Sequence, residues 1–205
     1  MDPRKHWDQV YERRAPDKVS WYRPHLERSL ALIEQVQLPT DAAIIDVGGG
    51  TSTLVDDLLN RGYRRLTVLD ISPKAIVTAR ERLGDRASAV SWLTGDITRV
   101  ELPVHEFDFW HDRAVFHFLR DEQSRARYVA AVRHALKPGG HVVVATFGPE
   151  GPERCSGLEV MRYNADDIHA QFGGIFRKLA SFTEIHHTPD GTEQEFVYCF
   201  CKMAD

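Results

Sequence analysis

The stretch AIIDVGGGTSTLVDDLL, residues 43–59, constrains the fold more than any other part of the chain. A short apolar run ends in an acid, three glycines follow, and apolar residues then resume at helical spacing. Such a strand, turn and helix opens an open parallel sheet, in which ligands bind outside the carboxyl ends of the strands. Gly48, Gly49 and Gly50 would let the backbone approach a ligand without a Cβ atom in the way. The stretch predicts a ligand site here, with a simple tight turn as the alternative.

Short apolar runs alternate with helical patterns along the middle of the chain. This alternation predicts a parallel sheet with helices on both faces. The expected strands are 43–47, 66–70, 89–96, 107–113 and 141–147, and the expected helices are 52–61, 72–83 and 121–136, the last ending at KPGG.

The two ends of the chain differ from this pattern. Residues 1–25 form an amphipathic arm, and RPHLERSLALIEQVQL continues it as a helix with Leu26, Leu30 and Ile33 on one face. After Phe147 come an irregular loop, a short helix at 164–171 and two strands around TPDGT, which predict an antiparallel hairpin. The fold class is therefore α/β, Rossmann-like, with a mostly parallel sheet and an antiparallel end.

Composition and charge argue against several classes of protein. The 205 residues suit one domain, and the formal net charge of -4 argues against a nucleic-acid-binding protein. No apolar run approaches the roughly 20 residues of a membrane-spanning helix. The first residues are too polar for a secretory signal. Three cysteines without framework spacing predict a reduced, cytoplasmic protein.

The residues after the glycines separate the possible ligands. A Walker phosphate loop needs a lysine followed by serine or threonine, but Thr51, Ser52 and Thr53 stand here. A dinucleotide fingerprint needs a third glycine where Thr53 stands, which weakens a nicotinamide-dependent oxidoreductase as an alternative.

Acids at the next two strand ends suit a nucleoside. Asp70 ends the second strand and can accept hydrogen bonds from both ribose hydroxyls, although an acid leading a helix is its structural alternative. Asp96 follows the third strand and can accept from an adenine amino group, with Ile97 offering an apolar face to the ring. A turn aspartate is the alternative for Asp96.

DVGGG resembles the acid-x-Gly-x-Gly opening of class I S-adenosylmethionine-dependent methyltransferases, and FDFWHDRAVFHFL and LKPGGHVVVATF resemble their fourth and fifth strands. The resemblance covers residues 40–147 and implies the seven-stranded fold, with S-adenosylmethionine as cofactor and S-adenosylhomocysteine as product. It also implies where the cofactor would lie. Its amino acid part would lie at Asp46, Gly48, Gly49 and Gly50, its ribose at Asp70 and Ile71, its adenine at Asp96 and Ile97, and its sulfonium near His111, Asp112 and Arg113.

The arm carries a narrower resemblance. HWDQVYERRAPDKVSWY is similar to the entry segment of a subgroup that includes lysine methyltransferases of elongation factor 1A and of citrate synthase. The resemblance implies that Trp7, Tyr11 and Tyr22 close over the cofactor as a lid. The alternative is that they form only the apolar face of an N-terminal helix.

The methyl acceptor is less well defined. A nitrogen nucleophile is favoured, either a protein lysine or a small molecule. HDRA stands where many nucleic-acid amino methyltransferases have Asn/Asp-Pro-Pro-Tyr or Phe, which argues against methylation of nucleic-acid bases. Asp112 is a candidate for steering a cationic acceptor. The wall of the acceptor pocket would come from residues 148–205, including RCSGLEVMRY, for which a capped loop is the alternative. The candidates for acid or base chemistry, each with a structural alternative, are His111, Asp112, His117, His186 and His187.

Other functions stay open at this point. Cys155, Cys199 and Cys201 raise a thiol or metalloid methyltransferase as an alternative, but no metal site is predicted, because no ligand spacing accompanies them. A protein that binds S-adenosylmethionine without catalysis is a further alternative. The sequence sets no oligomeric state.

Overall fold

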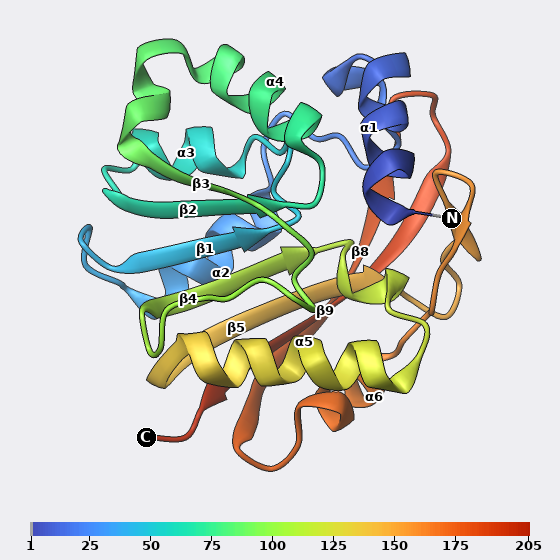
Figure 1. Cartoon of the computed structure of the whole chain (residues 1–205). Helices are drawn as coiled ribbons and strands as arrows, with labels where there is room; N and C mark the ends of the chain where they lie inside the picture. Colours follow the sequence, from blue (N-terminus) through green and yellow to red (C-terminus); the bar gives the residue numbers. More distant parts are fainter. Residues whose placement is uncertain (1) are drawn as a thin grey trace.

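A computed structural model describes residues 2–205 and contains one seven-stranded sheet (Figure 1). The strand order is β3-β2-β1-β4-β5-β9-β8, in which β1 to β5 run parallel and β9 pairs antiparallel with both β5 and β8. The predicted α/β sheet with an antiparallel end is confirmed. The strands are β1 (Ala43–Val47), β2 (Arg65–Asp70), β3 (Val90–Thr94), β4 (Phe107–Arg113), β5 (Leu136–Phe147), β8 (Phe176–His187) and β9 (Glu193–Met203), with a separate small pair, β6 (Arg154–Cys155) and β7 (Leu158–Glu159).

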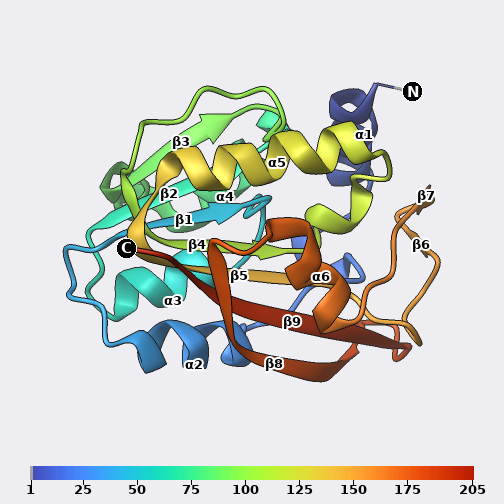
Figure 2. The ribbon, with the colours of Figure 1, turned by 90° about the horizontal axis from the view of Figure 1, so that it is seen from below.

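Helices cover both faces of the sheet (Figures 1 and 2). One face packs against α2 (Glu27–Val36), α3 (Leu54–Asn60) and α4 (Pro73–Leu83), and the other against α5 (Glu122–Ala135) and α6 (Ala165–Phe172). Successive residues of β1 enter opposite layers, since Ile44 packs with α2 and α3 while Ile45 packs with α5 and α6. Three short 3₁₀ turns complete the chain: η1 (Pro16–Lys18), η2 (Gly84–Ala89) and η3 (Phe116–Phe118).

Capping residues fix the helix starts. The Ser72 hydroxyl accepts a hydrogen bond from the Ala75 amide at 3.2 Å, and Pro73 occupies the first turn, as expected from the sequence. Asp121 caps the start of α5, and its carboxylate accepts from the Ser124 amide at 2.8 Å. These caps satisfy amides that have no partner inside the helix.

Several boundaries differ from the expected ones, two of them at turns. The helix α3 begins at Leu54 because residues 51–53 continue the glycine turn, where Ser52 accepts from the Leu54 amide at 3.2 Å. The strand β5 begins at Leu136 and includes KPGG, since Leu136 pairs with Phe107 across a register shift. An expected turn is therefore an irregular strand end.

The arm lies over the carboxyl ends of the parallel strands (Figure 1). Its helix, α1 (Pro3–Arg13), is tied to α4 by a 2.6 Å hydrogen bond from the Ser72 hydroxyl to Asp8. Further along the arm, the Ser20 carbonyl lies 2.7 Å from His186 Nε2 of β8. The arm is thus attached at two places, to the start of α4 and to β8.

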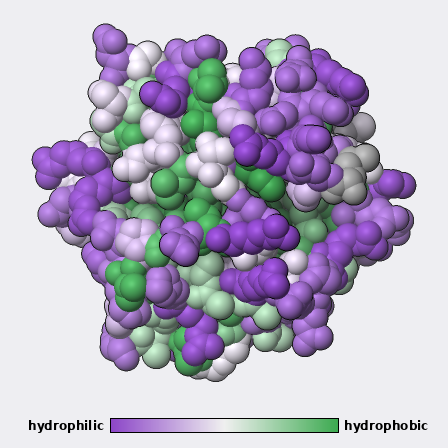
Figure 3. Space-filling model, viewed as in Figure 1, coloured by the Kyte–Doolittle hydropathy of each residue, from purple (hydrophilic) through white to green (hydrophobic). Residues whose placement is uncertain are grey.

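The surface seen in Figure 3 is mostly hydrophilic, with apolar side chains near the centre of the face. Among residues 2–205, no helix is both long enough and apolar enough to cross a membrane.

Candidate functional site

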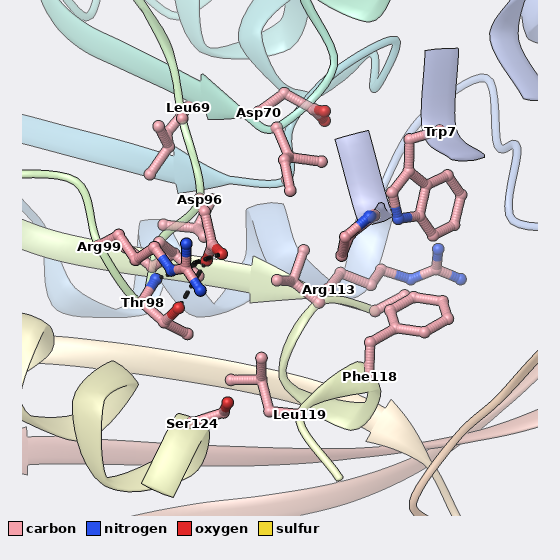
Figure 4. A pocket seen from close by; sticks show the side chains of 18 of the residues that line it. Trp7, Leu69, Asp70, Asp96, Thr98, Arg99, Arg113, Phe118, Leu119 and Ser124 are labelled. Carbon is pink, nitrogen blue, oxygen red and sulfur yellow. Dashed lines mark hydrogen bonds and ion pairs between the residues drawn. The ribbon is translucent and has the colours of Figure 1, made fainter. Parts of the chain in front are cut away.

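A cavity of about 370 Å³ lies at the carboxyl ends of β1, β2, β3 and β4, beneath the arm (Figure 4). A smaller cavity of about 30 Å³ shares Trp21, Gly48 and Arg113 with it. Together the two cavities collect most of the residues predicted to bind a cofactor. The larger is lined by Trp7, Tyr11, Gly48, Asp70, Ile71, Asp96, Ile97 and Arg113, and the smaller by Tyr22, Asp46, Gly48, Gly49, His111 and Arg113.

The glycine turn is crowded by the protein itself. A Cβ atom on Gly49 would lie 2.5 Å from the Asp46 carboxylate, and one on Gly50 would lie 2.5 Å from the Asp70 carboxylate. Gly48 has φ +69°, and its Cβ would meet the Val115 side chain at 2.0 Å. Gly49 therefore makes room for the buried Asp46, and Gly50 for the buried Asp70. Gly50 lines neither cavity.

Asp70 ends β2 at the wall of the larger cavity. Its side chain is buried, and one oxygen accepts from the Ser72 amide at 2.8 Å. Burial raises the pKa of this carboxyl to about 7, and the negative charges of Asp46 and Asp8 add to the effect, while the Ser72 hydrogen bond opposes it. A ligand that donates hydroxyl hydrogen bonds to Asp70 would replace the hydrogen bonds to water that the carboxylate loses when it is buried.

Asp96 and Ile97 form the wall beyond the third strand. One oxygen of Asp96 accepts from both the amide and the hydroxyl of Thr98, each at 2.8 Å, which fixes the carboxylate (Figure 4). Ile97 is buried, and Leu119 lines the same cavity. Thr98 and Leu119 are wall residues that sequence reasoning missed, because their role appears only when two loops meet.

Aromatic rings from two distant segments meet at the arm side of the cavity. Trp7 lies 5.7 Å from Trp21 and 5.1 Å from Phe118 between ring centroids, both edge to face. Tyr11 lies 6.2 Å from Trp21, and burial raises the pKa of its phenol well above the ordinary value. Trp21 and Phe118 were missed by sequence analysis, whereas Tyr22 lines only the smaller cavity.

Arg113 lies between the two cavities and is held rigidly. Its Nε donates to the Tyr198 hydroxyl and its Nη1 to the Trp21 carbonyl, both at 3.1 Å. The guanidinium carbon also lies 4.1 Å from the centre of the Phe196 ring. Its Nη2 is buried without a partner, which leaves a cationic donor unused.

Asp112 is placed away from both cavities. It is 0% exposed and accepts from the Val115 and Phe116 amides at 2.9 and 3.1 Å and from the Tyr128 hydroxyl at 2.6 Å. Burial raises its pKa to about 7, against the effect of these donors. The carboxylate holds the turn that follows β4 and lines neither cavity, which differs from the position expected from the sequence.

The candidate histidines also differ from the expected arrangement. Burial, with the charge of Arg113, lowers the pKa of His117 to about 3 and of His186 to about 4. His117 accepts from the Phe147 amide at 3.3 Å, and His187 is exposed, 3.6 Å from Glu193. Among residues 2–205, no histidine lines the larger cavity. The structure thus brings no histidine base to this cavity.

The cysteines are all free and buried. Cys155 of β6 lines the larger cavity, and burial raises the pKa of its thiol to about 11. Cys199 and Cys201 are neighbours on one face of β9, with their sulfur atoms 3.5 Å apart. Within residues 2–205, no three histidine, cysteine or acidic side chains are arranged to hold a metal ion.

Comparison with known proteins agrees with this geometry. A family model described as a methyltransferase domain matches residues 44–140. The chain is 28% identical to the eEF1A lysine and N-terminal methyltransferase of Bos taurus over 141 residues, which cover 66% of this chain and 20% of that protein. It is 32% identical to the malonyl-[acyl-carrier protein] O-methyltransferase of a Paenibacillus species over 135 residues, covering 64% of this chain and 46% of the relative.

The chain thus spans a fifth to a half of the length of these relatives. Among solved structures, an S-adenosylmethionine-dependent methyltransferase from Anabaena variabilis superimposes with a TM-score of 0.74 at 15% identity, over 99% of this chain and 96% of that one. The strand order, the matched segment and these relatives lead to one assignment. Residues 44–140 carry a methyltransferase domain, and the chain has the fold of class I S-adenosylmethionine-dependent methyltransferases.

Proposed function

We propose that the chain binds S-adenosylmethionine across the two cavities and directs its methyl group to a nucleophile of a second substrate. One observation carries this proposal. The smaller cavity is lined by Asp46 and Arg113, and each has a buried polar atom without a partner, Oδ2 in Asp46 and Nη2 in Arg113. Leaving such atoms unpaired is costly.

An α-amino acid end matches this pair of atoms. Its ammonium group would donate to Asp46, and its carboxylate would accept from Arg113. Because Arg113 is already fixed by Tyr198, Trp21 and Phe196, little side-chain entropy would be lost on binding. S-adenosylmethionine joins such an end to an adenosine through a sulfonium.

The larger cavity suits the adenosine. Asp70 would accept from the ribose hydroxyls, Asp96 from the adenine amino group, and Ile97 would pack against the ring. The rings of Trp7, Tyr11 and Phe118 lie at the arm side, where an aromatic face stabilises a positive charge such as a sulfonium. This division supports the placements implied by the sequence, except for Asp112 and Gly50.

When bound, the cofactor supplies a methyl group that an acceptor removes by in-line displacement. The chain's own contribution is to orient both partners and exclude water beneath the arm. Cys155 and Tyr11 have raised pKa values and stay protonated at neutral pH. Neither can then take a proton from the acceptor, and we propose that the acceptor arrives already deprotonated, as a neutral amine or an ionised oxygen.

A nitrogen acceptor, either a protein lysine or a small molecule, is our leading proposal, supported by the similarity to a protein named as an eEF1A lysine and N-terminal methyltransferase. A carboxylate oxygen is the second candidate, supported by the relative named as a malonyl-[acyl-carrier protein] O-methyltransferase. We further propose that residues 1–205 act as one methyltransferase domain with the arm as its cover. The three free thiols support a reducing, cytoplasmic setting.

Titration calorimetry tests the proposal, with S-adenosylmethionine, S-adenosylhomocysteine and NAD as ligands. We expect micromolar binding of both sulfur nucleosides, on the order of -8 kcal/mol, and none of NAD. Arg113→Met should weaken both, while Arg177→Met, a change at an exposed arginine of β8, should not. Absence of binding to well-folded protein would refute the proposal.

A labelled-methyl screen over protein and metabolite fractions then tests transfer. Label in a protein band would support a lysine acceptor, and base-labile label would indicate a carboxyl ester. Binding without transfer to any fraction would favour a non-catalytic binding protein.

A further inference from the structure

A chain of three buried polar side chains lies behind the smaller cavity. His111 Nδ1 is 2.7 Å from Asp46 Oδ1, and His111 Nε2 is 2.8 Å from the Ser29 hydroxyl. The exposed fractions of Ser29, His111 and Asp46 are 0%, 1% and 4%. The three residues come from α2, β4 and β1, so only the tertiary fold brings them together.

The direction of the hydrogen bonds follows from their chemistry. A carboxylate only accepts hydrogen bonds, so His111 Nδ1 carries a proton and donates a hydrogen bond to Asp46. In the neutral imidazole, Nε2 is then an acceptor, and the Ser29 hydroxyl donates to it. Asp46 and His111 are direct neighbours in the register of β1 and β4, which fixes the distance between them.

These contacts leave one oxygen of Asp46 free. Oδ1 is bound to His111, while Oδ2 has no hydrogen-bond partner and lies next to Gly49. Both Asp46 and Gly49 line the smaller cavity. Without His111, the carboxylate could rotate about its Cβ–Cγ bond or turn toward another donor. The imidazole therefore determines which oxygen faces the cavity.

We infer that Ser29 and His111 are positioning residues that hold Asp46 in the orientation needed for the ammonium group of an amino acid ligand end. The inference rests on the proposed function, which places that end in the smaller cavity. The geometry resembles a Ser-His-Asp nucleophile system, but Ser29 is fully buried and lines neither cavity, so no substrate reaches its hydroxyl.

The test compares two ligands that differ only in this end. S-adenosylhomocysteine carries the amino acid, and 5′-methylthioadenosine has the same adenosine and sulfur without it. Calorimetry on the full chain would measure both ligands with wild type, His111→Leu, His111→Asn and Ser29→Ala. His169→Leu is the control, because that histidine lines neither cavity and contacts the Phe176 carbonyl of β8.

We expect His111→Leu to weaken S-adenosylhomocysteine binding by about tenfold or more, the usual effect of losing an oriented charged hydrogen bond. The affinity for 5′-methylthioadenosine should stay within about twofold of wild type. His111→Asn, whose amide nitrogen can replace Nδ1, should recover most of the loss. Ser29→Ala should cause a smaller loss, again only for the amino acid ligand.

Equal losses for both ligands would show a merely structural role and overturn the inference, and so would unchanged affinity for both. If His111→Leu fails to fold, Ser29→Ala gives the same comparison of the two ligands, with the smaller expected loss. Failure of wild type to bind either ligand would refute the proposed function and this inference together. If wild type binds both ligands and only the variants depart from the expected pattern, the inference alone is refuted.

Discussion

Replacing Asp70 by asparagine should stabilise the free protein while impairing its proposed ligand site. The carboxyl has a pKa of about 7 in the folded protein, against 3.8 as the ordinary value, chiefly because burial penalises its charge. The folded state therefore holds this proton more tightly than the unfolded chain does. Stability falls as pH rises from about 4 to about 7 and is constant above that range, by linkage.

The size of the effect follows from this shift. About three pH units at about 1.4 kcal/mol each give a penalty of about 4 kcal/mol above pH 7. Asparagine keeps an acceptor for the Ser72 amide but loses the hydrogen bond from the Gly50 amide, a cost of about 1 kcal/mol. Asp70→Asn should therefore raise the free energy of unfolding by about 3 kcal/mol at pH 8. At pH 5 the gain should nearly disappear.

Urea unfolding at pH 5 and pH 8 measures this difference. Asp112, His117 and His186 titrate alike in both proteins, so their effects cancel in the comparison. Asp121→Asn is the control, because hydrogen bonds from Ser124 lower the pKa of that exposed carboxyl and no gain is expected.

At pH 8, where the carboxyl is ionised, the same variant should bind S-adenosylhomocysteine about 10 to 100 times more weakly in calorimetry, because a neutral acceptor replaces a charged one. A variant less stable than wild type at pH 8, or equally stabilised at both pH values, would refute the account of Asp70.

Three further substitutions test other parts of the site. Gly48→Val should destabilise the fold itself, by about 2 kcal/mol or more, because of its positive φ and its clash with Val115; added Val115→Ala should restore part of the loss in urea melts. Tyr128→Phe removes a donor to buried Asp112 and should reduce stability by about 2 kcal/mol, with no change in cofactor affinity by calorimetry. Trp7→Leu should weaken S-adenosylmethionine more than S-adenosylhomocysteine, by about 1 kcal/mol, since only the former is charged at sulfur; equal weakening would contradict the cation–π role.

Much of the wall of the larger cavity could be predicted from local patterns. Asp70 and Asp96 were found because each follows a recognisable strand, and the carboxyl ends of parallel strands always meet at one edge. The helix start at Ser72 and the hairpin around TPDGT are similarly local, since a cap or a turn depends on a few adjacent residues.

Polar side chains on β4 show the limit of such patterns. His111, Asp112 and Arg113 are consecutive, yet they face Ser29 and Asp46, the η3 turn, and the two cavities respectively. Alternation along the strand indicates that neighbours point to opposite faces, but it does not identify the partner waiting on each face. For that reason the strand pattern alone did not show that Asp112 lines neither cavity or that His111 contacts Ser29 and Asp46.

The sequence by itself therefore determined the α/β fold, the start of α4 at Ser72 and the acids at the strand ends, because these depend on periodicity and on chain neighbours. Only the tertiary structure decided which polar atoms are paired and which remain free. Ser29 and His111 are 82 residues apart, and Arg113 and Tyr198 are 85 apart, so packing alone sets their hydrogen bonds. The same packing leaves one oxygen of Asp46 and one nitrogen of Arg113 without a hydrogen-bond partner, and both residues line the smaller cavity.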